Sequence, residues 1–159
     1  MEAIHIMSSE KSRNKVTIGI TFGAFELCHA GHVAMLNECK KQCHWLIVGL
    51  QTDPTIDRPG VKNKPIQTTY ERWMQLQALK AVDEVIPYDT EEDLLNMLSM
   101  LHIDKRFIGS DYKDVEINGA DICRAKNIEV VYIERLHTYS SSELRRRLNN
   151  ANTGNGKTS

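Results

Sequence analysis

Apolar and polar residues recur in two different periods along the chain, and these periods predict strands that alternate with helices. Residues 16–22 alternate large apolar side chains with small or polar ones, which predicts a strand with one large and one small face. Residues 45–50 (WLIVGL) are continuously apolar, as in an interior parallel strand that is covered on both faces. Three shorter apolar runs predict the remaining strands, at residues 85–87, 106–109 and 129–133.

A helical period fills the segments between these strands. Residues 31–41 carry apolar side chains along one stripe, which predicts an amphipathic helix. Two further helices are expected to begin at threonine caps, Thr69 and Thr90, and both carry leucines at helical spacing. The last two predicted helices are residues 120–126 and a C-terminal helix that Ser141 or Ser142 caps.

Strands that alternate with helices predict an α/β protein with a single doubly wound, mostly parallel five-stranded sheet. The 159 residues fit one domain, which we place at residues 15–150. Residues 1–14 lack a sustained period and residues 151–159 are rich in Asn and Gly, so we expect a flexible arm and a flexible tail. In such sheets, ligands bind beyond the carboxyl ends of the strands, at the switch point.

Composition narrows the class of protein further. The chain is 41% hydrophobic and 26% charged with a formal net charge of −1, so local groups rather than a broad basic surface must bind any anionic ligand. No run approaches the roughly 18 apolar residues of a membrane span, and the N-terminus is too polar for a signal peptide. The four cysteines lack zinc-ribbon spacing and are expected to be reduced, which predicts a cytoplasmic protein.

The segment GAFELCHAGH, residues 23–32, follows the first predicted strand and leads into a helix, so it lies at the expected ligand-binding edge. Gly23 permits a tight turn, and Gly31 leaves room at the start of the helix, where free N–H groups favour an anion. His29 and His32 are one helical turn apart, so both imidazoles can address one ligand. This pair suits phosphoryl transfer, in which positioning and electrostatics supply most of the catalysis.

Two plainer explanations of the histidine pair stay open. Histidines at this spacing can bind a metal, but no third ligand stands out in the sequence, so no metal site is predicted. They can also be unrelated surface residues, although the glycine between them and the strand–loop–helix context argue against that explanation.

Residues 23–32 resemble the GxFDxxHxGH signature of the HIGH-type nucleotidyltransferase superfamily. Four later segments, KNKPIQTTYERW, ALKAVDEVIPY, GSDYK and RLHTYSSSELR, are similar to successive segments of small cytidylyltransferases. Their order and spacing resemble those of glycerol-3-phosphate cytidylyltransferases. The resemblance implies a Rossmann-like nucleotidyltransferase fold, a homodimer, and Mg²⁺ carried mainly by the nucleoside triphosphate.

The resemblance also implies roles for individual residues. His29 and His32 would bind the nucleotide phosphates and stabilise the transition state, and Lys62 or Lys64 would neutralise phosphate charge. The rest of the nucleotide site would comprise Gly23, Ala24, Phe25, Ala30, Gly31, Arg135, Tyr139, Ser140, Ser141 and Ser142. The acceptor would contact Lys64, Arg72, Lys80 and Asp111. Plainer roles remain for the loop lysines as solvated residues, for Arg72 and Lys80 as an exposed helix face, and for the serines as N-caps.

Several positions depart from the family pattern. Glu26 stands in place of the usual aspartate, and Ser110 in place of an acid. Residues 136–138 replace a Thr-x-Gly segment, and the acidic residues 90–93 stand where glycerol-3-phosphate enzymes carry an aromatic residue and a cation. The same scaffold, with a GxDYK turn and a closing run of Ser or Thr, also serves sugar-phosphate adenylyltransferases that make nucleotide-heptoses.

The sequence therefore predicts a cytidylyltransferase that joins CTP to a small alcohol phosphate, most simply glycerol 3-phosphate, and releases pyrophosphate. No general base is required, because the acceptor phosphate is already anionic at neutral pH. Two alternatives are adenylyl transfer to a sugar phosphate and a nucleotide-binding module without catalysis. Neither nucleic acid nor a membrane is an expected partner.

Overall fold

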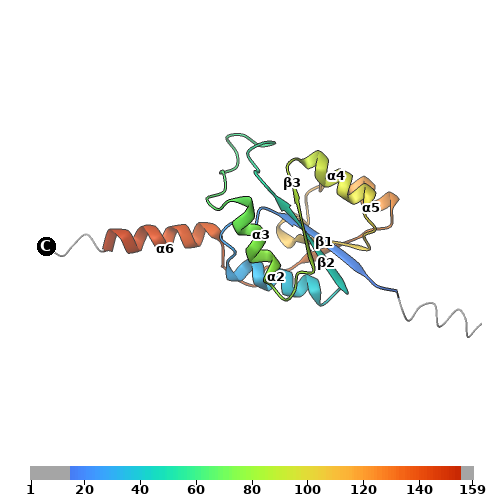
Figure 1. Ribbon diagram of the computed structural model, residues 1–159, viewed down its shortest axis with the longest axis horizontal. Coiled ribbons are helices and arrows are strands. Elements are labelled where there is room, and N and C mark those ends of the chain that lie inside the picture. Colours follow the sequence, from blue (N-terminus) through green and yellow to red (C-terminus); the bar gives the residue numbers. More distant parts are fainter. Residues whose placement is uncertain (1–14, 155–159) are drawn as a thin grey trace, which may run out of the picture.

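A computed structural model describes residues 15–154 of the chain and contains one five-stranded sheet (Figure 1). All strand pairs are parallel and the strand order is β3-β2-β1-β4-β5, which confirms the predicted doubly wound α/β fold. The strands are β1 (Ile18–Gly23), β2 (Trp45–Gln51), β3 (Glu84–Tyr88), β4 (Lys105–Gly109) and β5 (Glu129–Ile133). The order reverses between β1 and β4, so the carboxyl ends of these two strands form the switch point.

Helices cover both faces of the sheet, with α2 and α3 on one face and α4 and α5 on the other (Figure 1). The bounds are α2 (Ala30–Lys40), α3 (Thr69–Gln77), α4 (Glu91–Met100), the 3₁₀ turn η1 (Ser110–Tyr112), α5 (Ala120–Ala125) and α6 (Ser141–Gly154). α6 projects away from the sheet (Figure 1). Over residues 15–154, no helix combines the length and the apolar character needed to cross a bilayer.

Each face of the sheet buries its own apolar cluster, and β2 contributes to both. Leu46 and Val48 pack in the α2/α3 cluster with Leu36, whereas Ile47 packs in the α4/α5 cluster with Leu98. The run WLIVGL is apolar at successive positions because helices cover both of its faces.

The start of α3 differs from the predicted cap by one residue. Thr68, rather than Thr69, is the N-cap: its Oγ1 accepts a hydrogen bond from the Glu71 N–H at 3.2 Å. The Glu71 carboxylate in turn accepts one from the Thr68 N–H at 2.7 Å, which completes a capping box. Thr90 caps α4 as predicted.

The C-terminal helix is also shifted. Ser140, rather than Ser141 or Ser142, caps this helix, because the Ser140 Oγ accepts a hydrogen bond from the Glu143 N–H in the first turn at 3.1 Å. The helix continues to Gly154, past the predicted start of the flexible tail, while residues 1–14 and 155–159 lie outside the described residues.

Arg72 joins the carboxyl ends of β1 and β2 to the start of α3. Its side chain is 1% exposed, and all five N–H donors bond to protein oxygens. The acceptors are Ala24 O (2.8 Å), Gln51 O (2.7 Å), Thr52 O (2.6 Å), Gln67 O (3.3 Å) and Thr69 Oγ1 (3.4 Å). The predicted role of Arg72 in acceptor binding does not fit this position, because no donor is left for a ligand.

Replacing Arg72 by Met should lower the free energy of unfolding by about 3–5 kcal/mol, because several carbonyl groups would stay buried without a partner. Denaturant titration followed by circular dichroism measures this change. Arg124→Met, at an exposed position of α5, is the control and should shift stability by no more than about 0.5 kcal/mol. Lost acceptor affinity with intact stability would instead support the substrate role.

Candidate active site

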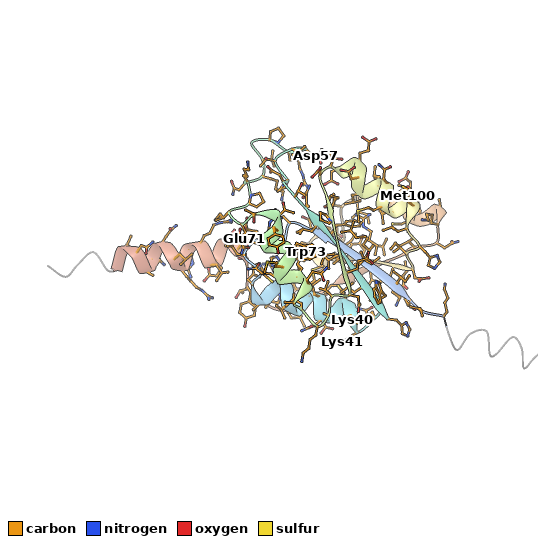
Figure 2. All side chains as sticks on the ribbon, in the orientation of Figure 1. Lys40, Lys41, Asp57, Glu71, Trp73 and Met100 are labelled. Carbon is orange, nitrogen blue, oxygen red and sulfur yellow. The ribbon has the colours of Figure 1, made fainter. Side chains whose placement is uncertain are left out.

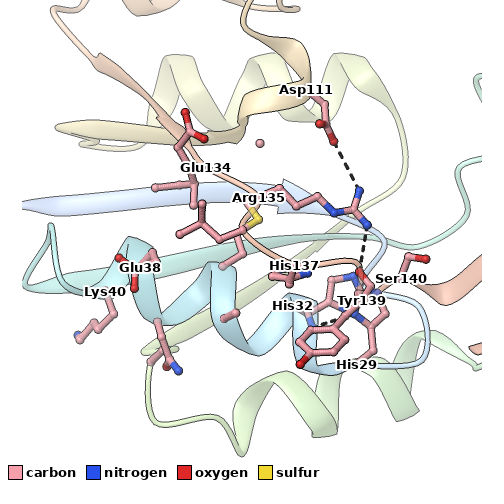
Figure 3. Close-up of a pocket in the computed structure, with 18 of the residues that line it drawn as sticks. His29, His32, Glu38, Lys40, Asp111, Glu134, Arg135, His137, Tyr139 and Ser140 are labelled. Carbon is pink, nitrogen blue, oxygen red and sulfur yellow. Dashed lines mark hydrogen bonds and ion pairs between the residues drawn. The ribbon is translucent and has the colours of Figure 1, made fainter. Parts of the chain in front are cut away.

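A cleft of about 1020 Å³ lies between α2 and residues 134–140, which join β5 to α6 and are called the closing segment here. Figure 3 shows its central part, with the two N-terminal histidines of α2 facing side chains of the closing segment. The predicted residues that line it are His29, Gly31, His32, Lys80, Asp111, Arg135, Tyr139, Ser140, Ser141 and Ser142. The structure thus brings together the two halves of the predicted nucleotide site, which lie far apart in the sequence.

The loop from β1 to α2 turns through two non-glycine residues in the left-handed region, Phe25 (φ 47°) and Leu27 (φ 56°). Gly23 was expected to supply this turn, but its φ is not in that region. Its missing side chain leaves room for the Phe25 ring instead, because a Cβ there would make a tight contact of 3.1 Å with that ring. The Phe25 ring is buried and lies 5.2 Å, centroid to centroid, from the His32 ring, so the turn packs against the site.

His29 is the N-cap of α2, a position usually held by Ser, Thr, Asp or Asn. Its Nδ1 accepts a hydrogen bond from the Gly31 backbone N–H at 3.1 Å. A neutral imidazole that accepts at Nδ1 carries its proton on Nε2. The donor that His29 retains for a ligand is therefore the Nε2–H group.

The rings of His29 and His32 stack, with centroids 3.7 Å apart and planes inclined by 20°. The pKa of His32 is lowered to about 3, mainly because the ring is buried and also because of the charges of His29 and Arg135. Burial, followed by the charges of Arg135 and His137, also lowers the pKa of His29. Both rings are therefore neutral at pH 7 in the free protein. An anion beside the two rings would favour their charged forms.

The closing segment brings a cation and an aromatic pair to the cleft. The Arg135 Nη2 donates to the Tyr139 carbonyl at 3.0 Å, and its Nη1 lies 3.6 Å from an Asp111 carboxylate oxygen (Figure 3). Both members of this ion pair are largely exposed, so the pair is weak and the guanidinium can turn towards a phosphate. The His137 ring stacks on Tyr139 with centroids 5.1 Å apart, and within residues 15–154 its buried Nδ1 has no partner.

Glu26 holds the loop between β2 and α3 against the site. Its carboxylate accepts from the N–H groups of Ile66 at 2.7 Å and Gln67 at 3.3 Å. Its backbone carbonyl accepts from the Ser141 hydroxyl at 3.1 Å, which also fixes the start of α6. The glutamate that replaces the family's aspartate therefore connects three segments of the chain.

Several predicted site residues do not line the cleft: Gly23, Ala24, Phe25, Ala30, Lys62, Lys64 and Arg72. Lys62 and Lys64 are exposed on the loop between β2 and α3. Lys80 does line the cleft, but α3 ends at Gln77, so Lys80 and Arg72 do not share a helix face as expected from their spacing.

Other residues line the cleft without having been assigned a role from the sequence. They include His137 and Glu134 of the closing segment, Glu38 and Lys40 near the end of α2, and Lys41 directly after it. Figure 2 shows Lys40 and Lys41 close together at one edge of the body. The Lys40 ammonium is already engaged, with the Asp83 carboxylate at 2.5 Å and the His44 carbonyl at 2.6 Å. For His137, the only signal in the sequence was its place within RLHTYSSSELR.

The donor set does not converge on a metal ion. Across the described part of the chain, no group of three or more His, Cys, Asp or Glu side chains is placed to hold one. The His29 Nδ1 already accepts a hydrogen bond from the Gly31 N–H.

The parallel sheet of order 3-2-1-4-5, with a helix N-terminus and two imidazoles at its switch point, defines a Rossmann-like nucleotidyltransferase fold. The family model described as Cytidylyltransferase-like matches residues 20–147. The chain therefore belongs to the cytidylyltransferase-like family of nucleotidyltransferases.

Curated relatives include two proteins named bifunctional protein HldE. That of Granulibacter bethesdensis is 36% identical over 119 residues, covering 75% of this chain and 24% of the relative. That of Caulobacter sp. (strain K31) is 33% identical over 147 residues, covering 92% of this chain and 30% of the relative. The match thus spans less than a third of each of these longer proteins.

Two solved structures share the fold. The lipopolysaccharide core biosynthesis protein from Thermoplasma volcanium is 26% identical, with a TM-score of 0.59, and the match covers 79% of this chain and 100% of that one. The pantothenate synthetase from Thermus thermophilus is 13% identical, with a TM-score of 0.53 and coverage of 88% and 68%. The second likeness concerns the fold alone.

Gly31→Ala should weaken nucleotide binding by about tenfold or more. The added methyl group would lie 2.7 Å from the His137 Cε1 and 2.9 Å from both the Tyr139 carbonyl and the His29 Nδ1, so the closing segment and the His29 ring would have to move. Titration calorimetry with a nucleoside triphosphate measures the effect. Denaturant unfolding of the same variant separates an effect of the substitution on stability from an effect on the site. Unchanged nucleotide affinity in Gly31→Ala would show that the packing of His29 and the closing segment around Gly31 does not form the site.

Acid should destabilise the folded protein through His32. The unfolded chain binds a proton at this residue below a pKa of about 6.5, whereas the folded chain does so only near pH 3. Stability should therefore fall as the pH drops from about 6.5 towards 3, by up to roughly 1.4 kcal/mol per pH unit from this residue. Unfolding titrations at pH 4.5, 5.5 and 7 should show a flatter profile for His32→Asn. Replacing the exposed His102 by Gln controls for the loss of an imidazole elsewhere, and equal profiles for wild type and His32→Asn would contradict the assignment.

Proposed function

We propose that the protein transfers a nucleoside monophosphate from a nucleoside triphosphate to a sugar phosphate and releases pyrophosphate, with ATP as the preferred donor. The observation that carries the proposal is the stacked pair of neutral imidazoles, His29 and His32, at the N-terminus of α2 in a cleft large enough for a nucleotide. Membership of the cytidylyltransferase-like family supports the reaction type.

The donor nucleotide would lie in the cleft with its phosphates at the N-terminus of α2. The Nε2–H of His29 and the first N–H groups of the helix supply donors to the phosphate oxygens. Arg135 would leave its weak contact with Asp111 to bind phosphate, and the closing segment would cover the nucleotide. Mg²⁺ enters this proposal as part of the substrate, bound to the triphosphate.

In the chemical step, an oxygen of the acceptor phosphate attacks the α-phosphorus of the triphosphate in line with the leaving group. A new P–O bond forms, the bond between the α-phosphorus and the bridging oxygen breaks, and pyrophosphate departs with the bond electrons. The histidines stabilise charge that develops on the α-phosphate, which is the main catalytic contribution available to such a site. The acceptor phosphate is already ionised, so the protein need not remove a proton.

Two features favour a sugar phosphate and ATP over glycerol 3-phosphate and CTP. The curated relatives are bifunctional HldE proteins, and one similar structure is a lipopolysaccharide core biosynthesis protein. The GSDYK turn and the closing run of serines also resemble those of adenylyltransferases that make nucleotide-heptoses. The first prediction, CMP transfer to glycerol 3-phosphate, is therefore the second candidate here.

The decisive experiment incubates the protein with each of ATP, CTP, GTP and UTP against heptose 1-phosphate, mannose 1-phosphate and glycerol 3-phosphate, and measures pyrophosphate release. We expect turnover with ATP and a sugar 1-phosphate. His29→Asn and His32→Asn should each lower kcat by about 100-fold or more, because charge stabilisation supplies most of the rate. His44→Asn, outside the cleft lining, is the matched control.

Other results of this experiment would support the two alternative functions or overturn the proposal. Turnover with CTP and glycerol 3-phosphate alone would replace the proposal by the cytidylyl reaction. Tight nucleotide binding without pyrophosphate release from any pair would indicate a binding module. Full activity of both histidine variants would overturn the role given to the imidazole pair.

A further inference from the structure

Arg106 is a second buried arginine, and its surroundings differ from those of Arg72. It lies in β4, beside Ile20 of β1, and is 6% exposed. The structure gives its guanidinium one hydrogen bond, from Nη1 to the Asn118 carbonyl at 2.5 Å. Its Nε is buried without a partner, and within residues 15–154 no carboxylate lies within ion-pair distance. A buried cation with so few partners is costly unless an anionic or oxygen-rich group completes its environment.

A second unpartnered donor lies on the same face of the sheet. Gln51, the last residue of β2, is 5% exposed, and its Nε2 is buried without a partner in the described residues. Gln51 is in register with Tyr88 of β3, and Gly49, two residues earlier, lies under the Phe22 ring. Ile47 of the same strand packs in the α4/α5 cluster. Alternate residues of a strand share a face, so Gln51, four residues later, also points to the α4/α5 face.

Two aromatic rings lie between Arg106 and the strand pair that carries Gln51. The Arg106 guanidinium lies over the Phe22 ring, 5.5 Å from its centroid. The Phe22 ring in turn makes an edge contact with Tyr88, with centroids 5.7 Å apart. Phe22 directly precedes Gly23, where the chain leaves β1 for the histidine loop. The Arg106 guanidinium therefore lies beside the carboxyl end of β1, and Gln51 lies at the carboxyl end of β2, both on the face of the sheet opposite the cleft.

Polar residues surround the Arg106 guanidinium, and hydrogen bonds and an ion pair among them fix their positions. The Asn118 side chain donates to the Glu91 carboxylate at 2.9 Å, and Arg58 lies 3.3 Å from the other oxygen of that carboxylate. The Glu91 N–H donates to the Asp57 carboxylate at 2.7 Å, which anchors the loop that carries Asp57 (Figure 2) to the start of α4. Gly119 has φ 81°, and a Cβ there would lie 3.3 Å from the Arg106 Nη1, so the turn brings Asn118 close to the guanidinium.

We infer that Arg106 and Gln51 form the subsite that binds the oxygen-rich end of the phosphorylated acceptor; this rests on the proposed function. Both groups are donors, so the ligand must offer acceptor oxygens, and the positive charge disfavours a cationic ligand. The acceptor class is therefore a polyhydroxylated or anionic phosphate, such as a sugar phosphate, and not a choline-like or ethanolamine-like phosphate. The nucleotide occupies the α2 face, the acceptor enters from the α4/α5 face, and the two meet beyond the end of β1.

The test compares wild type with Arg106→Met by titration calorimetry, with α,β-methylene-ATP present and absent. The probes are heptose 1-phosphate, mannose 1-phosphate, glycerol 3-phosphate and phosphocholine. We expect wild type to bind a hydroxylated phosphate and not phosphocholine, and Arg106→Met to bind the hydroxylated phosphate about 10- to 100-fold more weakly. Affinity for α,β-methylene-ATP should change by less than about twofold, since Arg106 does not line the nucleotide cleft.

Denaturant unfolding distinguishes a ligand-binding role of Arg106 from a structural role. Arg106→Met should unfold at the same or a higher denaturant concentration, because removing a poorly paired buried charge is often neutral or stabilising. Arg72→Met is the matched comparison and should be strongly destabilised. If Arg106→Met fails to fold, Gln51→Leu provides the same affinity test with a neutral side chain of similar size.

Each result decides the inference. Unchanged acceptor affinity in a folded Arg106→Met or Gln51→Leu protein overturns it, as does a wild type that binds none of the hydroxylated phosphates or prefers phosphocholine. Acceptor affinity is measured without turnover. Arginine-dependent binding of a sugar phosphate without pyrophosphate release would therefore support the subsite while contradicting the proposed reaction.

Discussion

One hydrogen bond, from the Gly31 N–H to the Nδ1 of His29, joins the fold to the chemistry of this protein. It caps α2 at the switch point of the sheet, where a hydroxyl or a carboxylate would cap most helices. It also sets the tautomer of His29, so that the Nε2 proton is available to a ligand. His32 then stacks on a ring whose position is fixed by the backbone. The imidazole pair is therefore ordered by helix capping at His29 and by the packing of the Phe25 ring against His32.

The two buried arginines show how the same side chain takes different roles in different surroundings. Arg72 has five donors and five protein acceptors, so its charge stabilises the junction of two strand ends with α3. Arg106 is buried to a similar degree, but the described chain leaves most of its donors without acceptors. The number of satisfied donors, and not burial alone, separates a structural arginine from one suited to a ligand.

The order of strands and helices, the parallel sheet and the position of the histidine loop could be predicted from sequence, because they follow from apolar periods and from glycine and cap positions. The predicted cap was wrong by one residue at Thr69, because Thr68 and Glu71 form a capping box. The environment of Arg72 could not be predicted, since its five acceptors come from separate segments of the chain. His137 was missed for a similar reason: its place beside Gly31 depends on the path of the closing segment.

The two faces of the sheet differ in whether their polar residues come from one short segment of the sequence or from several strands. On the α2 face, the histidine loop supplies the reactive groups within a single short segment, residues 23–32, so the sequence indicates phosphate chemistry directly. On the α4/α5 face, Gln51, Tyr88 and Arg106 come from three strands, and no short pattern contains them. The residues of the proposed acceptor subsite are therefore not part of the signature. This explains why the histidine motif predicts the class of nucleotidyltransferases but carries little information about the acceptor, which depends on side chains brought together only by the fold.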